Sequence, residues 1–186
     1  MTMSFSEHFT RHIKVVQESV TALESIALAA AATITDSLRD GGKVLAFGNG
    51  GSSTQASHLA EELVGRFRKN RRPFPAISLS SDAGTVTCIS NDFGYEAVFE
   101  RQIEAFARKG DVAVALTTSG KSETVIRALR AATSRGAATI ALTGSAGLTG
   151  VDASHVLAVP SDDSAIIQEV HLMLIHLFCM AVDEIA

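Results

Sequence analysis

The sequence predicts a doubly wound α/β fold, in which about five parallel strands form one sheet with helices on both faces. Short, continuously apolar segments recur along the chain, and a helical pattern follows most of them. Such segments are typical of strands in a parallel sheet that is covered on both sides. Loops rich in Gly, Ser and Thr follow two of the strands. Right-handed crossovers place these loops at the carboxyl edge of the sheet, where this architecture binds ligands.

Composition and charge indicate one globular domain over residues 1–186. The chain is 46% hydrophobic and 19% charged, and it is long enough to bury a substantial core. Its net charge of −4 gives no general attraction to nucleic acid or to an anionic membrane. The basic run 66–72 is typical of a solvated helix exit, although Arg66 is close enough to the preceding helix to face an anionic ligand or a neighbouring subunit.

Cysteine usage and the chain's first residues favour a cytoplasmic protein. Cys88 and Cys179 are far apart and form no CxxC motif, which argues against a disulfide scaffold and for a reducing compartment. No basic segment precedes an apolar one at the N-terminus, and the apolar run 26–32 is too short to span a bilayer. We therefore expect neither a nucleic-acid nor a membrane partner.

Residues 1–41 are predicted to form an N-terminal helical extension. Apolar residues recur every three or four positions from Phe5 to Leu23, and Gly41-Gly42 supplies a stop. The pattern predicts two helices with a break near residues 23–25. The apolar stripe either folds back onto its own domain or packs against another subunit, and we favour a role in oligomerisation.

Alternating strand and helix patterns fill residues 42–186, the predicted α/β core. Strands are predicted at residues 43–47, 75–80, 111–116, 138–142 and 155–159. Helices are predicted at residues 53–64, 82–90, 95–107, 123–135 and 163–185, with a break at Asn91-Asp92-Phe93-Gly94.

Two loops of the core have the composition of anion sites. The loop at residues 48–53 is rich in glycine and opens a helix, so its backbone N–H groups are available to an anion. The loop at 117–122 carries four hydroxyl groups, more than helix capping requires, and they suit a phosphomonoester. Because both loops follow strands of one parallel sheet, we expect them to lie close together.

Neither loop fits a nucleotide motif. In a dinucleotide GxGxxG motif that starts at Gly48, the third glycine would stand at Ser53. In a Walker loop that ends at residues 120–122, the first glycine would stand at Ala115. A phosphorylated small molecule is therefore the expected ligand.

Polar residues on two helices point to acid–base or metal chemistry. His58 and Glu62 are four residues apart and share one helix face. Gln168, His171 and His176 interrupt an otherwise apolar run, and Gln168 and His176 lie two turns apart on roughly one side. Each residue alone is more often a structural polar residue with a satisfied hydrogen bond. If the two helices meet, however, His58, Glu62, Gln168 and His176 form a cluster that suits a divalent metal or proton transfer.

Six motifs stand in one order over nearly the whole chain: Gly48-Asn49-Gly50-Gly51-Ser52, His58-Leu59-Ala60-Glu61-Glu62-Leu63, Gly65-Arg66-Phe67, Asn91-Asp92-Phe93-Gly94, Thr118-Ser119-Gly120 with Ser122, and Ile167-Gln168-Glu169 with His171 and His176. Together they resemble the phosphoheptose isomerases, which are sugar isomerase (SIS) domain proteins. The resemblance implies a flavodoxin-like SIS domain and a homotetramer with active sites between subunits. It also implies interconversion of sedoheptulose 7-phosphate and D-glycero-D-manno-heptose 7-phosphate through an enediol, an early step toward heptose for lipopolysaccharide or other glycans.

The resemblance also implies roles for individual residues. Glu62 and His176 would be the catalytic acid/base pair. A zinc ion, one per subunit, would be held by His58, Glu62, Gln168 and His176. The sugar phosphate would contact Asn49, Gly50, Gly51, Ser52, Glu62, Asn91, Asp92, Thr117, Thr118, Ser119, Ser122 and Gln168.

Two positions depart from the family pattern and keep other functions open. Ala165 stands where the family usually has Asp, which leaves a role unfilled or filled by Asp162 or Asp163; Thr117 replaces a usual Ser. An isomerase of another phosphorylated sugar is one alternative. A non-catalytic SIS protein that binds sugar phosphates, or a relative that binds the bacterial replication initiator, is another. That relative lacks counterparts of Glu62 and His176, so their presence here favours the enzyme.

Overall fold

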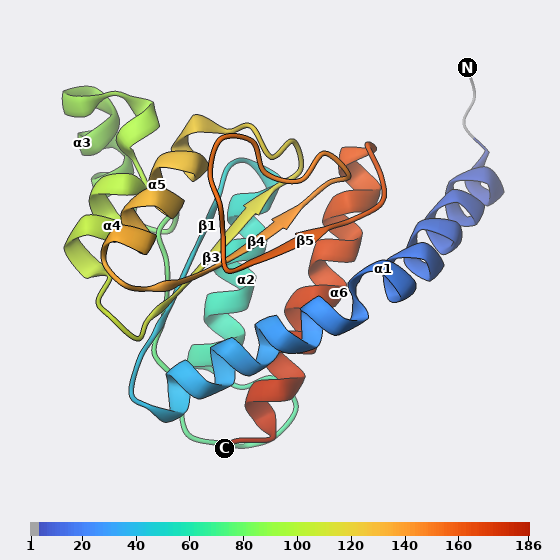
Figure 1. Ribbon diagram of the computed structural model, residues 1–186, viewed down its shortest axis with the longest axis horizontal. Coiled ribbons are helices and arrows are strands. Elements are labelled where there is room, and N and C mark those ends of the chain that lie inside the picture. Colours follow the sequence, from blue (N-terminus) through green and yellow to red (C-terminus); the bar gives the residue numbers. More distant parts are fainter. Residues whose placement is uncertain (1–3) are drawn as a thin grey trace.

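The computed structural model, which describes residues 4–186, contains one five-stranded parallel sheet in the order β2-β1-β3-β4-β5 (Figure 1). This confirms the predicted doubly wound α/β class. The strands are β1 (Val44–Gly48), β2 (Ala76–Ser78), β3 (Val112–Thr117), β4 (Ala138–Thr143) and β5 (His155–Ala158). The chain reverses its direction of winding between β1 and β3, so ligands are expected outside the carboxyl ends of these two strands.

Helices cover both faces of the sheet. They are α1 (Phe5–Arg39), α2 (Gly51–Val64), α3 (Ala83–Phe93), α4 (Glu100–Phe106), α5 (Glu123–Ser134) and α6 (Ser164–Asp183), with a 3₁₀ turn at Tyr95–Ala97. The segments α1, α2 and α6 pack on one face, whereas α4 and α5 lie on the other (Figure 1).

The central strands are apolar throughout because each faces helices on both sides. Val44 and Ala46 of β1 point into the core beneath α1, α2 and α6, whereas Leu45 and Phe47 point into the core beneath α4 and α5. This alternation follows the two-residue repeat of a strand. All five residues of β1 are buried, as the sequence pattern predicts.

The N-terminal extension is one continuous helix, so the predicted break at residues 23–25 is wrong. The buried stripe of α1 continues through Leu23, Ala27 and Ala30, and nothing in the sequence interrupts the helical spacing. A capping box at Ser4 and Glu7 starts the helix. Its second half packs on α6 and β5, whereas the first half exposes large apolar side chains, with Phe5 79% and Val20 60% exposed.

Two other predicted boundaries also need correction. The helix α3 continues through Asn91 and Asp92 to Phe93, and it ends at Gly94, whose φ of 87° suits glycine. The helix predicted at residues 95–107 is instead a 3₁₀ turn followed by the short helix α4.

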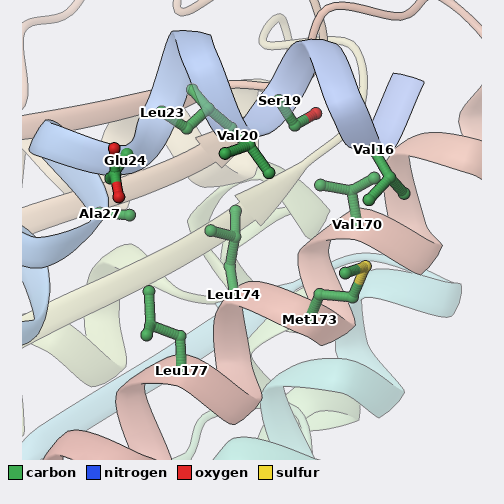
Figure 2. A pocket seen from close by; sticks show the side chains of 10 residues that line it. All are labelled: Val16, Ser19, Val20, Leu23, Glu24, Ala27, Val170, Met173, Leu174 and Leu177. Atoms are coloured by element: carbon green, nitrogen blue, oxygen red, sulfur yellow. The ribbon is translucent and has the colours of Figure 1, made fainter. Parts of the chain in front are cut away.

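Both α1 and α6 are long and apolar enough to cross a membrane by length and composition alone, with 28% and 50% of their apolar windows buried. Their packing provides a different reason for this composition. A groove of about 200 Å³ runs between them, lined by Val16, Val20 and Leu23 of α1 and by Val170, Met173, Leu174 and Leu177 of α6 (Figure 2). Some apolar residues of the two helices thus face each other across this groove, whereas Phe5 and Val20 of α1 and Met173 of α6 remain at least half exposed.

Candidate active site

The two glycine- and hydroxyl-rich loops lie side by side, as predicted. We call residues 48–53 and 117–122 together the loop edge. Gly48 at the end of β1 is in register with Leu116 of β3. The Asn49 amide Nδ2 then donates a 2.8 Å hydrogen bond to Thr124 Oγ1 in the first turn of α5. One side chain therefore joins the first loop to the helix that the second loop opens.

Glycines let the first loop approach its neighbours closely. Gly50 precedes α2 with a φ of 55° and provides no side-chain cap. A Cβ on Gly48 would lie 2.7 Å from the carbonyl oxygen of Leu116, and one on Gly51 would lie 2.7 Å from Gln168 Nε2. A larger residue would collide with the backbone at Gly48, whereas at Gly51 it would displace the Gln168 side chain. The start of α2 has no side-chain cap, and the Ser52 and Ser53 N–H groups donate to the carbonyl oxygens of Asn49 and Gly50 at 3.0 Å.

Hydroxyl groups of the second loop divide into two kinds. Thr117 is buried, and its Oγ1 accepts a hydrogen bond from Gly120 N, so it shapes the loop from inside. Ser119 is exposed and accepts from Lys121 N at 3.3 Å. Thr118 Oγ1 accepts from Ser164 Oγ at the start of α6, and Ser122 is the N-cap of α5 without a side-chain cap bond. Ser119 and Ser122 are thus the hydroxyls best placed for a ligand at the start of α5.

Tyr95 is a member of this region that sequence reasoning missed. Its hydroxyl donates a 2.8 Å hydrogen bond to Asn49 Oδ1, so Tyr95 and Thr124 fix the Asn49 amide from both ends. A cavity of about 150 Å³ lies beside it, lined by Gly48, Asn49, Gly50, Ser53, Ser80, Val86, Tyr95, Val98 and Phe99. A single tyrosine after a glycine forms no recognisable motif. Only the structure shows that Tyr95 bonds Asn49.

Asn91 and Asp92, which the family resemblance assigns to the sugar phosphate, are exposed on α3. Their polar contacts remain within that helix: Asn91 Nδ2 donates to Asp92 Oδ1 at 2.7 Å, and Cys88 Sγ lies 3.7 Å from Asp92 Oδ2. Their role in binding stays a prediction.

The helices α2 and α6 meet and bring three of the predicted acid–base residues together. His58 Nε2 lies 3.2 Å from His176 Nε2 and 3.7 Å from Glu62 Oε1. We call His58, Glu62 and His176 the histidine cluster. The Glu62 side chain is only 20% exposed, so its carboxylate lies in a partly dry environment. Groups that accept and donate protons thus converge from two helices.

A second glutamate, Glu61, orients His58. Glu61 Oε1 lies 2.8 Å from His58 Nδ1, an arrangement in which the ring nitrogen donates to the carboxylate. In the neutral ring this leaves the lone pair of Nε2 directed at Glu62 and His176. Donor atoms of His58, Glu61 and Glu62 all lie within 4.8 Å of one another, so this group can hold a metal ion. A carboxylate behind a histidine ligand is a common feature of metal sites.

Gln168 lies two turns of α6 before His176 and beside the first loop. It sits near the start of α6, where its side-chain amide packs against Gly51 and its backbone carbonyl oxygen accepts from Gln55 Nε2 at 2.6 Å. About 12 Å along the helix axis separates it from His176. The structure therefore places Gln168 at the loop edge and three of the four predicted metal ligands in the cluster.

Two further ionisable residues on α6 have structural roles. His171 is fully buried, and Nε2 lies 3.2 Å from the carbonyl oxygen of Thr143. Burial lowers the pKa of His171 to about 4, so the ring is neutral at neutral pH and Nε2–H donates. Burial raises the pKa of Cys179 to about 12, and the nearby Glu62 charge adds to the effect, so this thiol stays protonated.

Comparison with known proteins identifies the family. The SIS domain family model matches residues 8–144. The phosphoheptose isomerase of Aquifex aeolicus is 51% identical over 155 residues, which cover 83% of this chain and 81% of that protein. The phosphoheptose isomerase of Roseiflexus sp. is 44% identical, with 96% and 95% covered. This chain belongs to the phosphoheptose isomerase family.

Solved structures of phosphoheptose isomerases share the fold described above. The structure from Neisseria gonorrhoeae is 38% identical with a TM-score of 0.87, and 96% of each chain is covered. The structure from Francisella tularensis is 34% identical with a TM-score of 0.90 and the same coverage. The Vibrio vulnificus NanR protein, at 16% identity and a TM-score of 0.66, shares the fold alone.

Proposed function

We propose that this protein is an aldose–ketose isomerase that interconverts sedoheptulose 7-phosphate and D-glycero-D-manno-heptose 7-phosphate. The observation that carries the proposal is the convergence of Glu62 and His176 from two helices, in a chain that belongs to the phosphoheptose isomerase family. The reaction moves one proton between adjacent carbons and another between their oxygens, so it requires two positioned groups that exchange protons.

Glu62 is the base in this proposal. Its carboxylate takes a proton from the carbon next to the carbonyl, which gives an enediol, and returns the proton to the neighbouring carbon. His176 gives a proton to the carbonyl oxygen and takes one from the adjacent hydroxyl, so the net charge of the pair is unchanged after turnover. The partial burial of Glu62 limits competing exchange with water.

The phosphate end of the substrate is assigned to the loop edge. Ser119 and Ser122, together with the first N–H groups of α5, suit its oxygens. Glu62 lies about 16 Å along α2 from Gly51. The sugar therefore either extends along α2 within one subunit or meets the loop edge of one subunit and the histidine cluster of another.

The residues of the histidine cluster also fit zinc. Nitrogen donors of a tetrahedral zinc site lie about 3.3 Å apart, given Zn–N bonds of about 2.0–2.1 Å, and the two Nε2 atoms here are separated by 3.2 Å. We assign His58, Glu62 and His176 as zinc ligands. Gln168 is the proposed fourth donor. When bound, zinc would polarise the substrate carbonyl.

A homotetramer in the cytoplasm is part of the proposal. The exposed apolar residues of α1 and Met173 of α6, which is 50% exposed, form a surface that water solvates poorly and that a second copy can cover. Light scattering of the purified protein should give about four times 19.5 kDa. A monomer at micromolar concentration would exclude an active site shared between subunits.

The isomerase activity is tested by incubating the protein with sedoheptulose 7-phosphate in deuterated water. Proton NMR should show formation of the aldose and incorporation of deuterium at the carbon next to the carbonyl. If the protein binds the sugar phosphate but performs neither reaction, the non-catalytic alternative replaces the enzyme.

Ala165 favours one alternative substrate class, another phosphorylated sugar. This residue is exposed in the first turn of α6, where the family usually has an aspartate. Asp163 is already engaged, because its Oδ1 accepts from Ala165 N and its Oδ2 lies 3.3 Å from Arg11. A panel of five- to seven-carbon sugar phosphates tests the assignment: a higher kcat/KM for a sugar other than the heptose would move the proposal to that substrate.

A further inference from the structure

The C-terminal end of α6 carries a buried carboxylate that anchors a loop. Asp183 is 4% exposed, and its Oδ2 accepts hydrogen bonds from the backbone N–H groups of Arg68 and Lys69 at 2.9 and 3.1 Å. Its Oδ1 accepts from Arg71 Nε at 2.9 Å. Burial alone would raise the pKa of Asp183, but these donors hold it below its ordinary value. The ionised carboxylate therefore ties residues 68–71 to α6.

The guanidinium of Arg71 joins the same carboxylate to α2. The Arg71 side chain is 2% exposed, and its two terminal nitrogens donate to the carbonyl oxygens of Glu62 at 2.7 Å and Leu63 at 3.0 Å. These carbonyls belong to the last turn of α2, which has no further helical N–H donors. A single side chain thus bridges the last turn of α2, at Glu62 itself, and the last turn of α6.

The loop between the two helices also contacts the other half of the histidine cluster. Phe67 directly precedes the anchored Arg68, and its ring packs on the ring of His176 with centroids 5.3 Å apart and planes tilted by 32°. Anchoring of the Arg68 and Lys69 N–H groups therefore also determines where Phe67 lies. The hydrogen bonds described for Asp183 and Arg71 join them to each other and to backbone groups of α2 and the loop, so both act through Glu62 and Phe67.

We propose that Asp183 and Arg71 form a buried clamp that positions Glu62 and, through Phe67, His176 for proton transfer. The proposal rests on the isomerase function proposed above, and both members of the clamp are positioning residues. Proton transfer between carbon atoms is sensitive to placement, and a displacement of about 1 Å costs about 10²-fold in rate. The clamp joins the last turn of α2, which includes Glu62, to the last turn of α6.

The chain offers a matched control for a purely stabilising role. Asp111 is also 4% exposed, and it accepts from two backbone N–H groups, those of Lys43 at 3.0 Å and Arg108 at 2.8 Å, and from Lys43 Nζ at 2.6 Å. Its partners lie before β1 and after α4, outside the two helices that carry the cluster. Asp111→Asn and Asp183→Asn therefore remove the same kind of buried charge from two places.

The first experiment compares these two variants with wild type in steady-state kinetics, below the unfolding temperature of each. Both substitutions should lower Tm by a similar amount. Asp183→Asn should lower kcat by about 10²-fold and leave KM for the sugar phosphate within about twofold, whereas Asp111→Asn should keep kcat near wild type. Equal values of kcat for the two variants would refute the clamp.

Arg71→Lys tests the geometry of the clamp apart from its charge. A lysine keeps the positive charge but cannot reproduce the planar fork that reaches Asp183, Glu62 and Leu63 together. Its kcat should fall as far as that of Asp183→Asn, and the double variant should be no slower than either single one. A wild-type kcat in Arg71→Lys would contradict the proposal.

A structural readout separates this inference from the isomerase function. In protein with ¹³C-labelled histidine, the ring Cε1–Hε1 signal of His176 should move in Asp183→Asn and in Arg71→Lys, and stay in place in Asp111→Asn. Arg71→Lys keeps the positive charge beside Asp183 and serves if Asp183→Asn fails to fold. If wild type lacks isomerase activity, the proposed function fails while this signal still tests the clamp. An unchanged His176 signal in the Asp183 and Arg71 variants would overturn the clamp.

Discussion

The turn inside the loop at 117–122 is held by hydrogen bonds between residues close in sequence, whereas the histidine cluster of α2 and α6 is formed by residues far apart in sequence. In the loop at 117–122, Gly120 N bonds Thr117 and Lys121 N bonds Ser119, all within three residues in sequence. In the cluster, His58 and His176 are 118 residues apart and meet only because α2 packs on α6. The turn inside this loop is therefore formed locally, whereas the cluster depends on the packing of two helices. The joining of the two loops through Asn49 and Thr124 likewise depends on distant segments. Substitutions at the loop edge should weaken binding, and substitutions in the cluster should slow the chemistry.

The largest expected effect is that of Glu62→Gln. The amide keeps the shape of the side chain but removes the base, so kcat should fall by roughly 10²- to 10⁴-fold, the usual contribution of a positioned acid or base. Steady-state kinetics with the sugar phosphate measures this, and His176→Gln should fall comparably. A near wild-type rate in Glu62→Gln would place the base elsewhere and remove the functional contrast between the two regions.

His171 anchors α6, the helix that carries His176, to Thr143 at the end of β4. Its pKa of about 4 in the folded protein lies below the value of about 6.5 for an unfolded chain. The unfolded state therefore binds the proton first as pH falls. The contribution to the free energy of unfolding is complete above pH 6.5 and decreases by about 3 kcal/mol as pH falls toward 4.

Urea unfolding at fixed protein concentration, between pH 7 and pH 5, measures this dependence. His171→Gln keeps a hydrogen-bond donor but cannot titrate, so its midpoint should vary less with pH than that of wild type. If the urea midpoint varies equally with pH in both proteins, groups other than His171 determine the loss of stability at low pH.

Glu61→Gln tests whether the histidine cluster is a metal site. If Glu61 orients a zinc-binding His58, its loss should weaken zinc affinity by about 10- to 100-fold. Competition with a chromophoric chelator provides the affinity. If zinc binds neither protein and changes neither stability nor activity, the cluster serves only in acid–base chemistry.

The smallest effect is expected from Ser119→Ala at the loop edge. Removing one hydrogen bond to a charged phosphate should raise KM by about tenfold, because such bonds contribute roughly 1.5–3 kcal/mol, and should leave kcat nearly unchanged. Ser134→Ala, at the opposite end of α5, is the matched control and should behave as wild type. A loss of kcat without a change in KM would reverse the assignment of the two regions.

The fold was largely predictable because its signals are local. The strand at 43–47 and the helix from 53 lie within one residue or two of β1 and α2, since burial on both faces requires a continuous apolar run. The prediction of a break in α1 was wrong for a related reason. Only one narrow face of a long helix is buried, so Glu24 and Ser25 on the exposed side mark no end.

The candidate site was predictable only in part. The i,i+4 spacing of His58 and Glu62 is visible in the sequence, and their meeting with His176 was conditional on helix packing. Tyr95 carried no sequence signal, and although Phe67 and Glu61 stand in family motifs, their contacts with His176 and His58 could not be read from the sequence. Gln168 shares one side of α6 with His176 but lies two turns away, at the loop edge.

The sequence by itself determined the order of strands and helices, the glycine loops at the carboxyl edge and the faces on which polar residues lie. These features depend on backbone preferences and side-chain periodicity, which act over a few residues. Only the tertiary structure decided that His58, Glu62 and His176 converge, and that Asp183 and Arg71 hold the helices that carry them. The physical reason is that the separation of two helices is fixed by side chains packed along their whole contact and by buried charges, whose partners are distant in sequence.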